Sequence, residues 1–494
     1  MCLAVATTER LVTVAILVRV WGICVFSDWS VLCAVAGLFA LAELGTNVYF
    51  SNRYQALVAR GDKPRLQKNI NIAFTVSIAL SLGCILAAIV LFFNVSVRSA
   101  LGIACLSLIE SRWLIILLVL DFCIRLPLGA LSELYRAIGL FARSQLLYSL
   151  LTIGRIAVFC LVWLINLPAV WAAFLLLIPP ITLGWLLYFW DIRRFEKITI
   201  CITRISLVEL QQVLKTSKWY AAQSWSTHFW NQLPPILLAT YAGSGEAVAT
   251  FVILRTLSSS VRQIPALFGV SAAIELARLL FSGSKSVLQK KIGDIGKIYC
   301  TLSGLAAGAL LGFGEQVFRI WTASAHLFDG TLLLLLTIPI LLTGLGAPLS
   351  LFLHYGNFAR QVGMGRVLQL SLLLPLATVM TALWGVHGCA VGLAVSEIVA
   401  VGGYVLVAGL RASGTSFRAY AAKCTPALVS AFGWSWFGAF AVRQIVADET
   451  VVGLLVALGA WGLAAAAPIL WLAVSRDRRR AFWQEARRAL RGLK

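Results

Sequence analysis

Long apolar segments separated by short charged clusters recur along this chain from Leu11 to Val474. A transmembrane helix needs about 20 mostly apolar residues, so segments of this length leave little sequence for a soluble domain. Of the 494 residues, 60% are hydrophobic and 12% are charged, against about 45–50% and about 25% in soluble domains. The sequence therefore predicts an all-α polytopic membrane protein and argues against a soluble globular enzyme.

Fourteen transmembrane helices are expected where apolar stretches alternate with charged or turn-rich breaks. The expected spans are residues 11–26, 29–50, 72–95, 114–131, 146–165, 169–190, 219–239, 247–270, 298–313, 331–352, 367–384, 390–410, 426–442 and 451–474. The polar segment 191–218 is predicted to form a surface helix. The basic segment 475–494 is predicted to form an amphipathic helix on the anionic inner leaflet, with a partner-binding tail as the alternative.

The basic residues fall almost entirely on one side of these spans. With the N-terminus in the cytoplasm, 32 of the 41 Lys and Arg residues lie in cytoplasmic segments and four lie on the opposite side. Lys and Arg are enriched in cytoplasmic loops, so both termini are predicted to be cytoplasmic. This bias also explains most of the net charge of +21 without a nucleic-acid partner.

An internal repeat is indicated by two cytoplasmic loops. The segments that begin at Gly61 and Gly283 both fit the pattern G-x-K-x-x-L-Q-K-x-I, and they lie 222 residues apart. Six helices separate them, so two parallel six-helix lobes are expected; chance agreement of two basic loops is the alternative. The predicted parts are an N-lobe (1–205), a C-lobe (206–424), two further helices (425–474) and the basic tail (475–494).

The 11 cysteines lie mostly inside or beside spans, without a Cys-x-x-Cys pair or metal-ligand spacing. They are predicted to be small buried apolar residues. Neither a metal site nor a cofactor is expected.

Five arginines inside the predicted spans are candidate binding residues for an anionic substrate, because an isolated charge in the bilayer costs about 2.5–3.5 kcal/mol on insertion scales. They are Arg19, Arg125, Arg155, Arg255 and Arg262. Arg255 and Arg262 lie seven residues apart, on one helix face, with Ser258 and Ser259 near it. Guanidinium groups bind phosphate oxygens in bidentate fashion, so this face suits a diphosphate; snorkelling to lipid headgroups is the alternative.

The other arginines have competing interpretations. Asp121 and Arg125 lie four residues apart, in the order that favours an intrahelical ion pair. A gating role is the alternative for Arg125, because Pro127 follows it and can loosen the helix. Arg155 is expected either to face a central cavity or to bond Asp121. Arg19, near the outer end of the first span, is expected to contact substrate or to snorkel.

Several residues are candidates for coupling transport to a H⁺ or Na⁺ ion, because a carboxylate that binds a cation in one conformation links the two processes. They are Glu43, Asp121, His228, Asn231 and Glu397. Structural roles are the alternative for Glu43, near Gly45, and for Glu397, which has neighbouring helices to bond.

Three local patterns lie near the N-terminus. One is the spacing of Arg19, Gly22, Phe26 and Trp29. The second is the acid-x-Gly turn of Glu43 and Gly45, and the third is the small-x-Gly-Asp loop at 59–62. Together with fourteen spans and the repeat, they resemble the multidrug/oligosaccharidyl-lipid/polysaccharide (MOP) exporter superfamily, and within it the Wzx-like polysaccharide or O-antigen flippases. Asn231 departs from that pattern, since many relatives carry an acid there.

The resemblance implies a flippase of the cytoplasmic (inner) membrane rather than an enzyme. Its substrate would be a polyprenyl-diphosphate-linked oligosaccharide, and its partners would be the bilayer and polysaccharide assembly proteins. A multidrug-type exporter of the same fold is the first alternative; in-span arginines outnumber in-span acids, which favours an anionic substrate. A polysaccharide polymerase or glycosyltransferase is the second, but the short outer segments show no recognisable constellation of acids.

Overall fold

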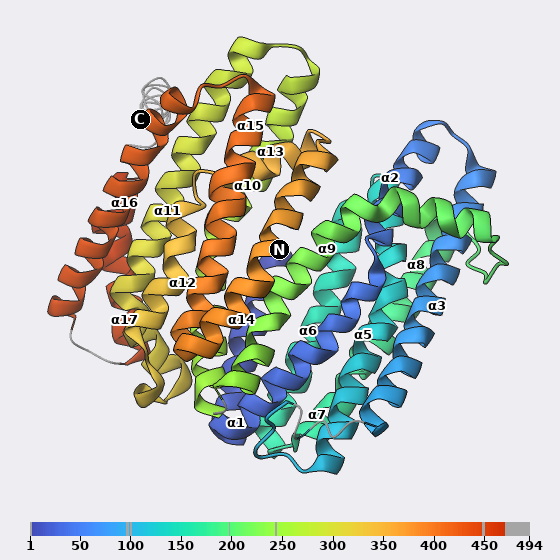
Figure 1. Cartoon of the computed structure of the whole chain (residues 1–494), viewed down its shortest axis with the longest axis horizontal. Helices are drawn as coiled ribbons and strands as arrows, with labels where there is room; N and C mark the ends of the chain where they lie inside the picture. The colour runs from blue at the N-terminus through green and yellow to red at the C-terminus, as the bar shows by residue number, and fades with distance from the viewer. Residues whose placement is uncertain are drawn as a thin grey trace, which may run out of the picture. The chain divides into compact units, whose positions relative to one another are not determined.

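A computed structural model describes residues 2–94, 98, 101–196, 198–242, 245–446 and 450–469, which are almost entirely helical and contain no strand (Figure 1). The N-terminal helical elements are α1 (Cys2–Leu38), η1 (Phe39–Glu43), α2 (Thr46–Ala59), α3 (Lys63–Asn94), α5 (Leu108–Ala137), α6 (Phe141–Ile165), α7 (Ala169–Leu175), η2 (Pro180–Leu186) and α8 (Leu187–Glu196). Then follow α9 (Leu207–Tyr241), α10 (Gly245–Phe281), α11 (Lys285–Thr322), η3 (Ala325–Leu327), α12 (Gly330–Leu342), α13 (Ala347–Tyr355), α14 (Ala359–Glu397), η4 (Ile398–Val405), α15 (Leu406–Ser413), α16 (Phe417–Ile445), α17 (Val451–Trp461) and η5 (Gly462–Ala466). The predicted amphipathic tail, 475–494, lies outside the described residues.

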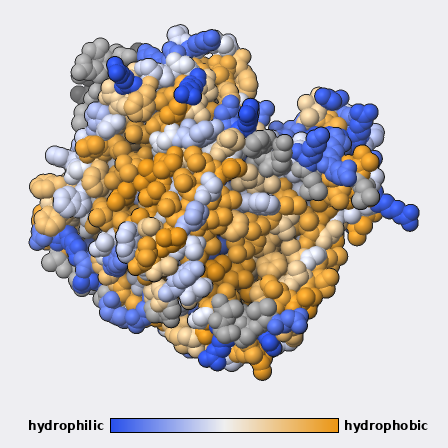
Figure 2. Space-filling model, viewed as in Figure 1, coloured by the Kyte–Doolittle hydropathy of each residue, from blue (hydrophilic) through white to orange (hydrophobic). Residues whose placement is uncertain are grey.

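Within the described ranges, nine helical segments are long and apolar enough to cross a membrane, and α12 with α13, bent by 52°, makes a tenth candidate. Figure 2 shows broad areas of apolar side chains on the visible face, with paler residues among them. All fourteen expected spans fall mainly on helical elements, and three of them contain a turn, at residues 44–45, 176–177 and 343–346. Residues 95 and 470–474 of these spans lie outside the described part. Fourteen spans were expected, and nine or ten segments qualify in the described ranges. Two pairs of expected spans each form one continuous helix across a kink, and α9 and α16 are less apolar.

The kinks correct two expected helix boundaries. The first break was expected between residues 26 and 29, and it lies at Gly22, whose φ of 73° is accessible to glycine without strain. The first helix also begins earlier than residue 11, since α1 starts at Cys2. The second kink, at Trp384 and Gly385, agrees with the expected break between 384 and 390.

The chain divides into two compact units, one of Met1–Thr256 with Arg366–Leu393 and one of Leu257–Gly365 with Ala394–Lys494. This grouping places α9 and most of α14 with the N-terminal helices. The lobe boundaries at residues 205 and 424 stay a prediction.

The local backbone supports the internal repeat. Gly61 and Gly283 both adopt positive φ, 68° and 75°. Each opens the same hydrogen-bonded turn: the peptide N–H groups of Lys63 and Lys285 donate to the carbonyls of these glycines, both at 3.0 Å. Two further bonds of the turn also recur at an offset of 222 residues, with 61→58 matched by 283→280 and 66→62 matched by 288→284. The two loops therefore share a conformation as well as a sequence pattern.

Residues 198–206, between α8 and α9, are extended, whereas a surface helix was predicted over the whole of 191–218. The peptide N–H groups of residues 199, 201 and 203 donate to the side chains of Gln67, Asn71 and Thr75 on α3, at 3.3, 3.2 and 3.0 Å. Four helical residues advance about 6 Å and two extended residues about 6.6 Å, so the two spacings match. The segment cannot become helical without losing these bonds, and helix begins only at Leu207.

A pH-sensitive contact fixes the start of α9. Lys68 Nζ lies 2.7 Å from Glu209 Oε1, and Ser206 forms a capping box with Glu209. The Lys68 ammonium and the Ser206 donors lower the pKa of Glu209 from 4.5 to about 2. Because the Glu209 carboxyl has a lower pKa in the folded than in the unfolded protein, its ionised form stabilises the folded state at pH values above the unfolded pKa. This stabilisation is lost as the pH falls toward the folded pKa.

We therefore expect the amides of residues 198–206 to lose protection from hydrogen exchange, relative to free-peptide rates, as the pH falls from about 4.5 to about 2. The variant Lys68→Met should show less protection at neutral pH and a smaller change on acidification. Identical pH profiles in the two proteins would contradict the role of this contact.

The second unit contains a helix pair that packs through glycine. Added Cβ atoms at Gly304 and Gly308 of α11 would lie 2.5 and 2.7 Å from backbone oxygens of α16, and one at Gly312 would lie 2.3 Å from Ala439 Cβ. The Ser435 hydroxyl donates to the Leu305 carbonyl at 2.7 Å. Small residues permit this close approach, so the backbones of α11 and α16 pack directly against each other.

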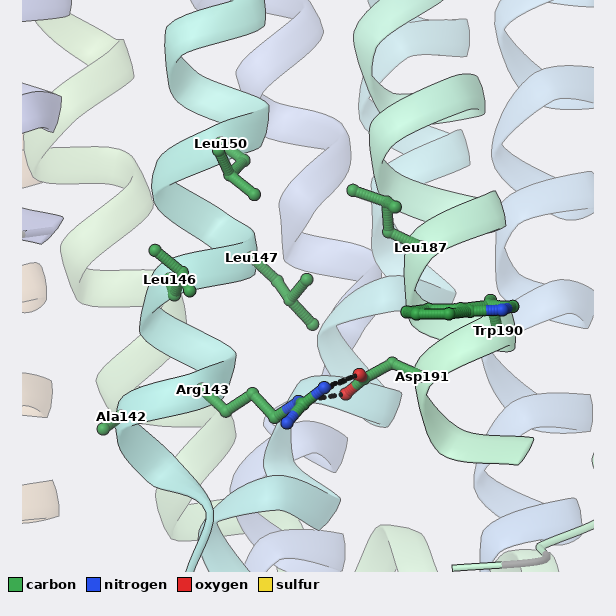
Figure 3. Close-up of a pocket in the computed structure, with 8 residues that line it drawn as sticks. All are labelled: Ala142, Arg143, Leu146, Leu147, Leu150, Leu187, Trp190 and Asp191. Carbon is green, nitrogen blue, oxygen red and sulfur yellow. Dashed lines mark hydrogen bonds and ion pairs between the residues drawn. The ribbon is translucent and has the colours of Figure 1, made fainter. Parts of the chain in front are cut away.

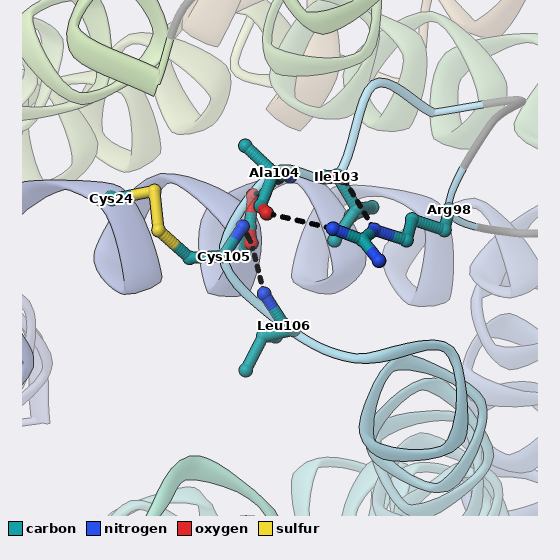
Figure 4. The surroundings of a disulfide bond; sticks show 7 residues. Cys24, Arg98, Ile103, Ala104, Cys105 and Leu106 are labelled. Atoms are coloured by element: carbon teal, nitrogen blue, oxygen red, sulfur yellow. Dashed lines mark hydrogen bonds between the residues drawn. A yellow bond between two sulfur atoms is a disulfide. The ribbon is translucent and has the colours of Figure 1, made fainter.

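The expectation of buried, unpaired cysteines is wrong at three positions, since Cys201 is exposed and two others form a disulfide. Cys24, just after the Gly22 kink, forms a disulfide with Cys105 (Figure 4), and the two α-carbons lie 6.0 Å apart. The buried Asp28 carboxylate holds the same loop by accepting the N–H groups of residues 104, 105 and 106 at 3.2, 2.8 and 2.9 Å. Cys105 lies in a predicted outer segment and Cys24 near the outer end of the first expected span, on the side where oxidising conditions allow disulfides.

We expect Cys24 and Cys105 to resist a membrane-impermeant maleimide added to intact cells, and to react after reduction. A variant that keeps only these two cysteines isolates the signal. Labelling before reduction would contradict the disulfide. Labelling only after the cells are opened would contradict the predicted topology.

Candidate functional site

Three helices of the first unit bring four charged side chains together, here named the charge cluster. Arg155 of α6 bonds Glu9 of α1, with Nε to Oε1 at 2.8 Å, and Asp121 of α5, with Nη1 to Oδ2 at 3.1 Å. Arg125, also on α5, bonds Asp121 Oδ2 through Nη2 at 2.6 Å and the Asp121 carbonyl through Nε at 3.2 Å. Two guanidinium groups thus share one carboxylate, and a second carboxylate balances the set.

Burial differs sharply within the charge cluster. The side chain of Asp121 is 5% exposed and that of Arg155 is 14% exposed, whereas that of Arg125 is 37% exposed. The two positive and two negative charges cancel, so the buried part is compensated internally. The cluster therefore combines a rigid interior with one partly exposed guanidinium.

The structure confirms the intrahelical pair of Asp121 and Arg125, and it assigns Arg155 to the interhelical bond with Asp121. Sequence reasoning missed Glu9, because the first span was expected to begin at residue 11. The apolar residues that precede Glu9 were the available signal, since they continue the helix to Cys2 and place Glu9 within it.

Arg125 retains hydrogen-bonding capacity. Its bonds use Nε and Nη2, and within the described part of the chain Nη1 has no hydrogen-bond partner. A guanidinium offers five N–H donors in a planar fork suited to phosphate and carboxylate oxygens. Arg125 can therefore bind an anion without giving up its contact with Asp121.

Arg255 bonds two backbone carbonyls of α9 that prolines leave without helical donors. Proline has no peptide N–H, so Pro234 and Pro235 leave the carbonyls four residues earlier, at Trp230 and Asn231, without their helical donors. Arg255 donates to both, with Nη1 to the Asn231 carbonyl at 2.9 Å. Its guanidinium also lies 4.4 Å from the centroid of the Trp230 ring. The structure thus gives Arg255 a helix-stabilising role that the sequence hypothesis did not include.

Pro127 in α5 shows the same compensation. It removes the helical donor of the Cys123 carbonyl, which accepts the Ser81 hydroxyl at 2.9 Å instead. The Ile124 carbonyl, three residues before Pro127, accepts Trp185 Nε1 at 3.1 Å. Each bond joins α5 to another element, so these carbonyls fix neighbouring helices in place.

In the second unit Arg262 pairs with Glu397. Arg262 Nη1 donates to Glu397 Oε2 at 3.0 Å, and Nη2 bonds the other carboxylate oxygen and Thr343 Oγ1. The Glu397 side chain is 8% exposed. The pairing gives Glu397 a structural role, which was the alternative to ion coupling. The Ser258 hydroxyl, expected beside the arginine face, donates to the Leu336 carbonyl at 2.9 Å.

Of the remaining candidates, Asn231 takes part in these contacts through its backbone carbonyl, which accepts from Arg255. Arg19 is exposed on α1, and His228 is half-buried on α9. The Asn231 amide donates to the Thr227 carbonyl at 2.9 Å. Glu43 lies beside the Asn47 amide and the Glu133 carboxylate, and no Lys or Arg pairs with either acid in the described ranges.

The expected turn at Glu43 and Gly45 is present. η1 ends at Glu43, Leu44 has φ 52° and Gly45 has φ 68°. A Cβ at Gly45 would lie 2.4 Å from the Ala221 backbone nitrogen of α9. Glycine is therefore required here by the backbone conformation and by the close approach of α9.

No family model and no curated protein matches this chain. Among solved structures, it resembles an inward-facing multidrug resistance MATE family transporter of the MOP superfamily, with a TM-score of 0.67, 16% identity, and coverage of 83% of this chain and 95% of the other. It also resembles the lipid II flippase MurJ in an inward closed conformation, with a TM-score of 0.70, 13% identity, and coverage of 93% and 96%. A MOP superfamily transporter from Pyrococcus furiosus has a TM-score of 0.53, 15% identity, and coverage of 84% and 96%. These likenesses establish that the chain has the fold of MOP transporters.

Proposed function

We propose that the chain is a flippase that moves a polyprenyl-diphosphate-linked oligosaccharide from the inner to the outer leaflet of the cytoplasmic membrane. It would act by alternating access and supply glycan units for surface polysaccharide biosynthesis. No catalytic step is involved in this function: the substrate crosses the membrane unchanged, while its lipid chain stays in the bilayer.

The observation that carries the proposal is the state of Arg125. Its guanidinium is 37% exposed and keeps an N–H group unbonded within the described ranges, on a helix apolar enough to span a membrane. The nearby acids Glu9 and Asp121 are already matched by arginine. A cationic substrate would find no unmatched carboxylate at this cluster, whereas a diphosphate would find a donor.

The fold is compatible with a lipid-linked substrate. Its solved relatives include a protein named as a lipid II flippase and a multidrug transporter, so this architecture accompanies both kinds of substrate. Arg19, Arg155, Arg255 and Arg262 remain proposed contacts for the diphosphate as the conformation changes. Arg155, Arg255 and Arg262 would have to exchange an internal partner for the substrate.

Ion coupling is the second element of the proposal. Glu43 with Glu133 provides two neighbouring acids that no Lys or Arg matches in the described part of the chain, which is the arrangement a H⁺ or Na⁺ ion can bridge. Asp121, His228, Asn231 and Glu397 remain proposed alternatives. Asp121 and Glu397 are less open to a cation, because arginine already pairs with each carboxylate.

The MATE likeness favours one alternative function, export of small molecules. Binding to the purified protein separates the two. We expect a polyprenyl-diphosphate glycan to bind more tightly than cationic dyes, and Arg125→Gln to weaken glycan binding about tenfold, consistent with loss of one charge-assisted contact.

The matched control is Arg136→Gln, an exposed arginine in the last turn of the same helix, which should bind the glycan normally. Equal weakening by both substitutions would indicate a general charge effect. Tight dye binding that is insensitive to Arg125→Gln would favour the exporter.

A further inference from the structure

The first unit contains a leucine-lined cavity of about 530 Å³ between α6 and α8 (Figure 3). Leu146 and Leu150 are 48% and 38% exposed on α6, and Leu187 lines the opposite wall from α8. In a membrane-spanning unit such exposed leucines face acyl chains. The cavity thus has the lining of a slot for a hydrocarbon chain.

An ion pair closes one end of this slot. Arg143 Nε donates to both Asp191 oxygens, at 2.9 and 2.7 Å, and the Tyr135 hydroxyl donates to Asp191 Oδ2 at 2.8 Å. Asp191 is buried, with a side chain 4% exposed, whereas Arg143 is 34% exposed. Figure 3 shows the leucines along α6 and α8 with this pair beyond them. Arg143 neutralises the charge of Asp191, and the more exposed member of the pair is the arginine.

A second cavity, of about 660 Å³, shares Trp190 with the first and is lined by two more arginines, Arg193 and Arg194. Both are exposed, and the Arg194 guanidinium lies 5.1 Å from the Trp190 ring centroid. The charged linings of the two cavities are three arginines and one aspartate, a net charge of +2. Tryptophan and arginine in this combination are typical of the headgroup level of a bilayer.

We propose that these two cavities form a binding site for an anionic phospholipid of the cytoplasmic leaflet. One acyl chain would lie along Leu146 and Leu150, and the headgroup phosphate would meet Arg193 and Arg194. Basic pockets between transmembrane helices on the cytoplasmic side bind anionic headgroups. The loop bias predicts that side for both the α5–α6 turn and the end of α8. This site goes beyond the proposed transport function and does not depend on it.

Native mass spectrometry of the full chain in detergent tests the site, with phosphatidylglycerol and phosphatidylcholine of identical acyl chains as probes. We expect phosphatidylglycerol to be retained preferentially. The double variant Arg193→Gln/Arg194→Gln should lose this preference by at least about tenfold, since both arginines attract anionic lipid. Leu146→Trp should lower retention by filling the slot while leaving the arginines in place.

The matched control is Lys285→Gln/Lys290→Gln, which removes the same charge from exposed positions on the predicted cytoplasmic side of the other unit. It should retain the preference. Equal loss in control and test variants, or no loss in the arginine variant, would overturn the site. Displacement of phosphatidylglycerol by polyprenyl phosphate at equal concentration would overturn it as well, because the slot would then belong to the transport substrate.

Discussion

Replacing Arg155 by methionine is expected to lower the free energy of unfolding by about 3–5 kcal/mol, the cost of breaking a buried ion pair from one side. Arg155 bonds Glu9 and Asp121, and both carboxylates are at least 80% buried, with exposures of 20% and 5%. Methionine fills similar apolar volume but leaves Glu9 without its cation. Thermal and denaturant unfolding of the purified protein measure the loss.

The double variant Arg155→Met/Glu9→Gln separates charge balance from packing. It removes one positive and one negative charge and keeps the bond of Asp121 with Arg125, so at least half of the lost stability should return. Arg60→Met, at an exposed position, should change the free energy of unfolding by less than about 0.5 kcal/mol. An Arg155→Met loss no larger than that of Arg60→Met would contradict the role of the charge cluster.

Replacing Arg255 by methionine is expected to cost about 1–3 kcal/mol of stability, because two carbonyls lose their donors. Pro234→Ala/Pro235→Ala would supply the missing peptide N–H groups to Trp230 and Asn231. In that background the cost of Arg255→Met should fall to a few tenths of a kcal/mol. An unchanged cost in the two backgrounds would show that these carbonyls are not what Arg255 stabilises.

The same set of variants distinguishes a helix-stabilising role from a substrate contact. If Arg255 acts only through α9, the triple variant should regain both stability and transport, provided that the double proline variant is itself active. Restored stability without transport would assign Arg255 a contact with the substrate. Transport per folded molecule is the quantity to compare.

Much of the fold could be predicted from the sequence. Hydropathy located the membrane helices because the bilayer requires about 20 apolar residues per span. The repeat was visible because Gly61 and Gly283 each adopt a positive φ, which favours glycine, and open turns that share three backbone hydrogen bonds. The turn at Gly45 followed a local pattern as well, since its constraint is a backbone conformation.

The partners of the charged residues could not be predicted in full, because they are set by contacts between distant parts of the chain. Arg155 bonds Glu9 at a separation of 146 residues, and Arg262 bonds Glu397 at 135. Hydropathy also fails to locate a sharp kink inside a continuous apolar run, as at Gly22. Cys24 follows this kink, and its disulfide with Cys105 was not predicted from the sequence either.

The most direct test of the proposed function is the leaflet distribution of the lipid-linked sugar pool in cells lacking this protein, read with a membrane-impermeant sugar-modifying reagent. We predict that complete glycan units accumulate on the inner leaflet, and that wild-type protein relieves the accumulation whereas Arg125→Gln, at equal protein level, does not. A normal distribution across the two leaflets in the deleted cells would contradict the proposal.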